Sequence, residues 1–250
     1  MRVSIGSLAV ACATAVLAVP LSAEDLTIVF KDGKGATETH YYTSGKMRHA
    51  SSASDTIMDF SAGTITTVDH KKKQYSQVTL AEIEAAMKQA SAQMEQQMAS
   101  LPPQVREKME QMMGGAAGSV TVTKGGTKKV AGYDTQQYTV TMGENLKTEL
   151  WNTTALALPF DPAQFRKMAS FATAAGPMVK SLAKMAEKMQ EVQGLTLAES
   201  TSFKMMGRTS ETSKEAVEVK QGAIAGETFA VPAGYKQVES PTLKAMGGRK

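Results

Sequence analysis

The sequence has 250 residues with 28 Lys and Arg against 24 Asp and Glu, which gives a formal net charge of +4. This length suffices for a buried core, so one domain is expected. Aromatic residues make up only 6% of the sequence, and the charged residues are interspersed. A nucleic-acid-binding surface has clustered arginines with aromatic residues between them, so this composition argues against a nucleic-acid-binding protein.

The first 23 residues are typical of a secretory signal peptide. Arg2 precedes an apolar run over residues 5–21 that ends in small residues, so we expect cleavage after Ala23 and export to the periplasm. The run is too short to favour a permanent membrane anchor. Cys12 is the single cysteine, and the apolar core continues beyond it, which disfavours lipidation there. The mature chain therefore needs no disulfide in an oxidising compartment.

Residues 24–78 have the pattern of consecutive antiparallel strands. Leu26, Ile28 and Phe30 alternate with other residues, as in a strand with one buried face. Turns such as Ser44-Gly45 separate the short apolar runs. We therefore expect strands at about 26–30, 40–42, 46–51, 57–60, 65–68 and 74–78.

A helical insertion is predicted over residues 79–114. Thr79 and Glu82 have the spacing of a capping box, in which a hydroxyl and a carboxylate satisfy free backbone donors. Pro102-Pro103 interrupts the helix, and Gly114-Gly115 ends it. One face carries an apolar stripe at helical spacing, made of Leu80, Ile83, Met87, Ala90, Met94, Met98 and Leu101.

The second half repeats this order of strands followed by a helical insertion. Strands resume near residue 120, and a turn is expected at Gly125-Gly126. Asp161 as N-cap and Pro162 at the first helical position open an insertion over residues 161–193. The remaining chain is expected to form strands at 195–206, 214–221 and 228–238, and a loose tail over 240–250.

Methionine is concentrated in the two insertions, which hold ten of the sixteen methionines that follow Met1. Thioether side chains are flexible and polarizable, so these stripes fit either ordinary core packing or an adaptable lining for an apolar ligand. Binding of cuprous ion is a third interpretation, since thioethers are soft ligands. A ligand groove would be lined by Met87, Met94, Met98, Met109, Met178, Leu182, Met185, Met189 and Trp151.

The sequence shows no arrangement of residues typical of an enzyme or a metal site. His40, His49 and His70 fall on separate strands or turns without the spacing of zinc ligands, so ordinary polar or cross-strand roles are expected. Asp55 and Asp59 form a carboxylate pair, but no nucleophile motif accompanies them. We therefore expect no catalytic residues, no metal and no cofactor.

Five short segments spread over the predicted mature chain carry a family resemblance. They are Gly45-Lys46-Met47-Arg48, residues 63–75, Val130-Ala131-Gly132-Tyr133-Asp134, Glu149-Leu150-Trp151 and residues 229–235. Together they resemble an exported bacterial family of unknown function that is related to the lipoprotein carriers of the LolA/LolB type. The resemblance implies an α+β fold, in which helical insertions cover one face of a curved antiparallel sheet, or half-open β-barrel. In those carriers the cavity holds acyl chains.

These observations predict a non-enzymatic periplasmic binding or carrier protein, with one domain over residues 24–239. The expected ligand is apolar, such as a lipid or the acyl chain of a lipoprotein, and a peripheral contact with the cell envelope is compatible with this role. Two alternatives stay open. One is an envelope structural or stress protein that binds no small molecule, and the other is a soft-metal protein that binds Cu(I).

Overall fold

The computed structural model describes residues 24–102, 104–105, 120–143, 145–161, 187–205 and 208–246. The predicted signal peptide, its cleavage after Ala23 and the question of Cys12 lipidation lie outside these residues. Within the described part of the chain, no helix combines the length and the apolar character that crossing a bilayer requires.

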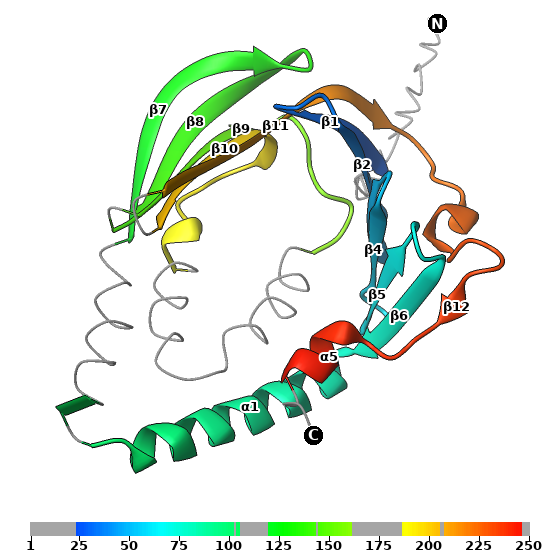
Figure 1. Ribbon diagram of the computed structural model, residues 1–250. Helices are drawn as coiled ribbons and strands as arrows, with labels where there is room; N and C mark the ends of the chain where they lie inside the picture. The colour runs from blue at the N-terminus through cyan, green and yellow to red at the C-terminus, as the bar shows by residue number, and fades with distance from the viewer. Residues whose placement is uncertain are drawn as a thin grey trace, which may run out of the picture.

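A single twelve-stranded sheet forms the body of the structure, and it is strongly curved and open (Figure 1). Its strand order is β12-β6-β5-β4-β3-β2-β1-β11-β10-β9-β8-β7. Neighbouring strands are antiparallel, except that β12 runs parallel to β6. The strands are β1 Leu26–Asp32, β2 Thr37–Tyr42, β3 Lys46–Ser51, β4 Ser54–Asp59, β5 Thr64–Asp69, β6 Gln74–Thr79, β7 Val120–Val130, β8 Tyr133–Met142, β9 Leu146–Thr153, β10 Leu195–Met205, β11 Arg208–Gln221 and β12 Lys236–Gln237.

Two antiparallel meanders make up this sheet. Strands β1 to β6 follow one another in space as they do in sequence, and so do β7 to β11. Short turns dictate most of this arrangement, because a tight turn returns the chain beside the strand that it has just left. The exception is β9 and β10, which residues 154–194 connect. The two meanders join where β1 pairs with β11. The predicted curved antiparallel sheet is confirmed, whereas helices contribute less to the described structure than the prediction implied.

The first helical insertion is confirmed at its start. Helix α1, Leu80–Ser100, begins where the Thr79 hydroxyl accepts a hydrogen bond from the Glu82 N–H (3.1 Å) and the Glu82 carboxylate accepts one from the Thr79 N–H (2.7 Å). These two bonds are the predicted capping box. From β6 the helix runs across the open side of the curved sheet (Figure 1). It contacts β6 and the short C-terminal helix α5, Pro241–Met246, where a loose tail was predicted.

Two local predictions are wrong. Gly125-Gly126 is a bulge within β7 and not a turn, since the pairing register with β8 shifts between Lys124 and Thr127. The Gln136 amide donates to both glycine carbonyls, at 2.7 and 3.0 Å, and so satisfies groups that the interrupted ladder leaves free.

The strand predicted over residues 228–238 is the second error, because only β12 forms there. A 3₁₀ helix, Gly226–Phe229, precedes it. Pro232 has no N–H for a ladder, and Gly234 adopts φ +83°, so neither residue continues a strand.

Buried residues form clusters on both faces of the sheet. The largest lies on the inner, concave face and contains Leu26, Ile28 and Phe30, which are at most 3% exposed. A second cluster on the outer face of the first meander joins Ile57 and Val68 to Phe229. The segment that follows β11 lies along this outer face (Figure 1), so the first meander is covered there by the chain's own C-terminal part.

Gly194, at the start of β10, is expected to tolerate no side chain. Its φ is +83°, and an added Cβ would lie 2.7 Å from the carbonyl carbon of Thr153. Gly234 has the same φ, but an added Cβ there meets no atom within 4 Å. We expect Gly194→Ala to lower the free energy of unfolding by about 2–4 kcal/mol, and Gly234→Ala by about 1–2 kcal/mol from backbone strain alone. Urea denaturation measures both, and equal losses would contradict the close approach at Gly194.

Candidate functional site

A cavity of about 580 Å³ lies on the concave face of the sheet. Strands of both meanders line it, together with residues of the connection between β9 and β10. Its volume falls in the range of small-molecule sites. Most of its lining is apolar, contributed by Phe30, Val120, Val140, Met142, Leu146, Leu150, Leu158, Met189 and Leu195.

One wall of this cavity is polar, and its groups contact one another. His40 lies between Tyr42, whose hydroxyl is 3.0 Å from Nδ1, and Glu38, whose Oε1 is 2.6 Å from Nε2. Lys214 of β11 donates to the same Glu38 oxygen over 3.0 Å. Its ammonium also lies 5.3 Å from the centre of the Phe30 ring. This side-chain cluster, Glu38, His40, Tyr42, His49 and Lys214, is called the polar wall below.

The ionisation of Glu38 decides which nitrogen of His40 carries the proton. Burial opposes ionisation of Glu38, but the hydrogen bonds from Lys214 and His40 outweigh it and lower the pKa of this carboxyl. A carboxylate can only accept, so His40 Nε2 is the donor and Nδ1 accepts from the Tyr42 hydroxyl. Burial, and next the nearby His49, lower the pKa of His40 to about 4. Burial also raises the pKa of Tyr42.

His49 is the cross-strand partner of His40, and the two rings stack with centroids 3.8 Å apart and planes 12° apart. Burial, and next Lys214, lower the pKa of His49. Its Nε2 atom is buried and has no hydrogen-bond partner among the residues that the structure describes. A buried polar nitrogen without a hydrogen-bond partner destabilises the folded protein, because its lost contacts with water are not replaced.

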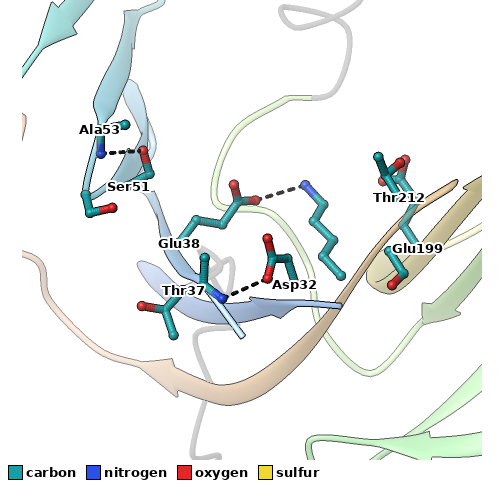
Figure 2. Close-up of a pocket in the computed structure, with 11 residues that line it drawn as sticks. Asp32, Thr37, Glu38, Ser51, Ala53, Glu199 and Thr212 are labelled. Carbon is teal, nitrogen blue, oxygen red and sulfur yellow. Dashed lines mark hydrogen bonds and ion pairs between the residues drawn. The ribbon is translucent and has the colours of Figure 1, made fainter. Parts of the chain in front are cut away.

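A second, more polar pocket of about 450 Å³ opens beside the polar wall (Figure 2). It lies between the β1–β2 turn and strands β10 and β11, and Figure 2 shows Asp32, Thr37 and Glu38 facing Glu199 and Thr212 across it. Glu199 and Lys214 line this pocket and also the concave cavity. The second pocket and the concave cavity thus adjoin at Glu199 and Lys214, which are register partners on β10 and β11.

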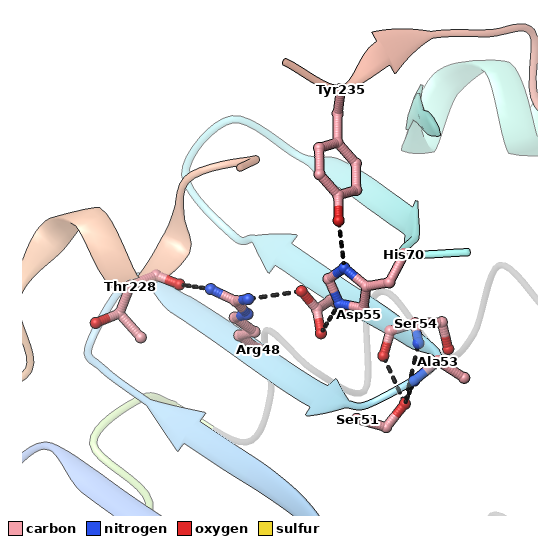
Figure 3. A network of polar contacts seen from close by, with 8 residues as sticks. All are labelled: Arg48, Ser51, Ala53, Ser54, Asp55, His70, Thr228 and Tyr235. Carbon is pink, nitrogen blue, oxygen red and sulfur yellow. Dashed lines mark hydrogen bonds and ion pairs between the residues drawn. The ribbon is translucent and has the colours of Figure 1, made fainter. Parts of the chain in front are cut away.

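A second polar cluster lies on the outer face of the sheet (Figure 3). Asp55, which is 1% exposed, lies 2.6 Å from Arg48 Nη2 and 3.0 Å from His70 Nε2. Arg48 also donates to the Thr228 carbonyl, and His70 Nδ1 lies 2.9 Å from the Tyr235 hydroxyl. Thr228 and Tyr235 belong to the segment that follows β11, so this cluster fastens that segment to the first meander. None of these five residues lines a described cavity.

The residues predicted to line a ligand groove are placed as follows. Met189 lines the concave cavity and packs beside the cluster of Val120, Tyr138, Val140 and Leu150. Trp151 lines a smaller neighbouring pocket of about 250 Å³, with Lys128 Nζ 4.7 Å from its ring centre. Met87 is buried on α1 and is not part of the described cavity lining. The side chains of Met94 and Met98, and residues Met109, Met178, Leu182 and Met185, lie outside the described part of the chain.

The polar wall was not predicted as a site, although one signal for it was available. Counting outward from the Ser44-Gly45 turn places His40 opposite His49, as the structure shows. The contact of Lys214 with Glu38 spans 176 residues, so the local pattern gave no indication of it. Within the described residues, no group of three His, Cys, Asp or Glu side chains could hold a metal ion.

Asp55 is expected to stabilise the fold much more than Asp59 on the same strand. Removing one partner of a buried pair leaves the other charge uncompensated, so Asp55→Asn should lower the free energy of unfolding by about 3 kcal/mol. Asp59 pairs with Lys46 and is more exposed, so Asp59→Asn should cost about 1 kcal/mol or less. Chemical denaturation checks both values, and faster proteolysis within residues 222–240 of Asp55→Asn would show that the segment is released.

The low pKa of His40 predicts loss of stability in acid. The unfolded chain takes up a proton near pH 6.5, whereas folded His40 does so near pH 4. Stability is therefore fully present above pH 6.5 and declines as the pH falls from 6.5 toward 4, by about 3 kcal/mol for this group. NMR titration of the imidazoles should show His40 neutral at pH 5, with His40→Gln as the assignment control. Titration of His40 near pH 6.5 would contradict the burial of this imidazole.

Comparison with known proteins gives structural similarity at low sequence identity. The chain is similar to PNGF-II (12% identity, TM-score 0.41), covering 90% of this chain and 32% of that one. It is also similar to an uncharacterised conserved protein from Thermus thermophilus (8% identity, TM-score 0.45, covering 88% of this chain and 92% of that one). MucB in the MucA/MucB complex of Pseudomonas aeruginosa is similar as well (12% identity, TM-score 0.43, covering 87% and 59%).

The chain spans about a third of the length of PNGF-II and about three fifths of MucB. None of these similarities assigns a function. No curated protein matches the sequence significantly. Residues 92–235 match the family described as "Domain of unknown function (DUF4412)", which confirms the predicted resemblance to a family of unknown function. Because this match covers more than half of the 250 residues, the chain belongs to the DUF4412 family.

Proposed function

We propose that this protein binds an apolar ligand, a lipid or the acyl chain of an acylated protein, in the concave cavity and without chemical conversion. The predicted signal peptide supports action after export, in the periplasm. The single observation that carries the proposal is the composition of the cavity, in which an apolar lining from β7 to β10 faces one compact polar wall. A ligand with a long apolar part and one polar end suits this division.

The expected affinity is sufficient for a carrier. Burying an acyl chain contributes about 0.8 kcal/mol per methylene, so ten methylenes give about 8 kcal/mol of gross affinity. The loss of translational freedom and the ordering of the chain offset part of this gain. A preformed cavity reduces the ordering cost on the protein side, because the lining residues lie largely on strands.

A binding role also agrees better with the polar clusters than catalysis does. His40 has both ring nitrogens engaged, by Tyr42 and by Glu38, so it has no free position for a proton from a substrate. His70 is likewise held between Asp55 and Tyr235, in a cluster that lines no described cavity. Neither cluster pairs an accessible nucleophile with a base, which a covalent mechanism requires.

Filling the cavity should abolish binding without unfolding the protein. Met142 lines the cavity and is only partly buried, so Met142→Trp should occupy its volume at a modest cost in stability. We expect the mature protein to take up the uncharged fluorophore N-phenyl-1-naphthylamine, and Met142→Trp to weaken uptake at least tenfold. Val217, which is 55% exposed on β11, provides the control Val217→Trp, with unchanged uptake.

Native mass spectrometry of gently purified protein provides an independent test, since a carrier is expected to retain some lipid. Absence of co-purifying lipid, together with no fluorophore uptake by the unmodified protein, would contradict the proposal. That result would favour the alternative of an envelope protein that binds no small molecule.

A further inference from the structure

The charges at the polar end of the cavity have a definite balance. Among the described residues that line the cavity or belong to the polar wall, Glu38 and Glu199 are carboxylates and Lys214 is the one ammonium. Two negative charges and one positive charge leave one negative charge. An anionic ligand head at this wall would therefore meet net repulsion, strengthened by the low dielectric of a partly buried site.

Lys214 already compensates one carboxylate of the wall. Its ammonium already donates to Glu38 at 3.0 Å and lies over the face of Phe30. Glu199 is its register partner on β10. A ligand carboxylate or phosphate would have to share this one ammonium with Glu38, and its negative charge would add to those of the two carboxylates at the wall.

The two stacked histidines supply no positive charge at neutral pH either. Protonation would place two like charges at a ring separation of 3.8 Å, and burial also disfavours the charged form of both rings. His49 lines the cavity, and its own Nε2 is buried without a described partner. An uncharged ester, amide or hydroxyl head carries no charge for the carboxylates of the wall to repel.

We propose that the cavity selects ligands with an uncharged polar head, namely acyl esters of glycerol or similar alcohols, over the corresponding free fatty acids. This inference rests on the proposed function and names the ligand class of the same site. The apolar lining recognises the chain, while the net negative charge at the polar wall repels a negative head. Such discrimination depends on a penalty against the wrong ligand as much as on contacts with the right one.

Two ligands with the same twelve-carbon chain test the inference directly. Monolaurin and laurate, each below its aggregation concentration at pH 7.5, are used to displace N-phenyl-1-naphthylamine from the mature protein. We expect monolaurin to bind at least tenfold more tightly than laurate. Laurate binding as tightly as monolaurin, or more tightly, would overturn the inference.

A pair of matched variants tests whether the wall charge is the cause. Glu199→Gln makes the wall neutral, so it should tighten laurate binding and reduce the ratio of the two affinities at least threefold. Glu218→Gln on β11 is the control, since Glu218 is exposed, pairs with Lys220 and does not line the described cavity. An unchanged ratio in Glu199→Gln would overturn the electrostatic cause.

The binding results also distinguish failure of this inference from failure of the proposed function on which it rests. Binding of laurate but not monolaurin overturns the inference and leaves the apolar-ligand function standing. If neither ligand binds and the fluorophore is not taken up, the proposed function itself fails, and the inference fails with it.

Discussion

The structure depends on the pairing of β1 with β11, which joins two meanders that are otherwise separate. Every other antiparallel contact in the sheet is made between strands that follow one another along the chain. This pairing connects residues near 26–32 to residues near 214–221, with one shift of register between Val29 and Phe30. The cavity has lining residues from both meanders, so without this pairing it would have only one wall.

The same pairing creates the polar wall. Asp32 is the register partner of Lys214, and on the other side of β1 Phe30 is the partner of Glu38. The Lys214 side chain can therefore reach across β1 to Glu38 while its ammonium lies over the Phe30 ring. Once Glu38 is held as an ionised acceptor, it orients His40, and His40 in turn provides the face on which His49 stacks. The pairing of β1 with β11 thus determines the side-chain contacts that make up the polar wall.

Local sequence signals account for much of the fold, and the reasons differ from one element to the next. The first meander was predictable because its turns are short and its apolar residues alternate. The start of α1 was predictable because a capping box is a contact over three residues. Gly125-Gly126 misled the prediction, since a pair of glycines suits a bulge as well as a turn.

Long-range contacts could not be predicted in this way. The cavity and its wall depend on Lys214 reaching Glu38, and the outer cluster depends on Tyr235 reaching His70, over 176 and 165 residues respectively. No periodicity in the sequence encodes which distant strands become neighbours. Of the predicted groove residues, Met189 alone is placed in the cavity lining by the described structure, so the role of the methionine stripes stays a prediction.

The bulge in β7 bears on how the edge of an open sheet avoids pairing with a second molecule. β7 is the last strand of the order, so within the described part of the chain one side of its backbone has no neighbouring strand to pair with. The unpaired backbone groups of an edge strand can pair with a strand of a second molecule. In many proteins, bulges and lysine side chains on the edge strand hinder such pairing. β7 carries both, with Gly125-Gly126 between Lys124 and Lys128-Lys129. Because Lys128 and Lys129 form ion pairs with Glu215 and Asp134, the irregular backbone at Gly125-Gly126 is the feature that most opposes the growth of a continuous intermolecular sheet from this strand.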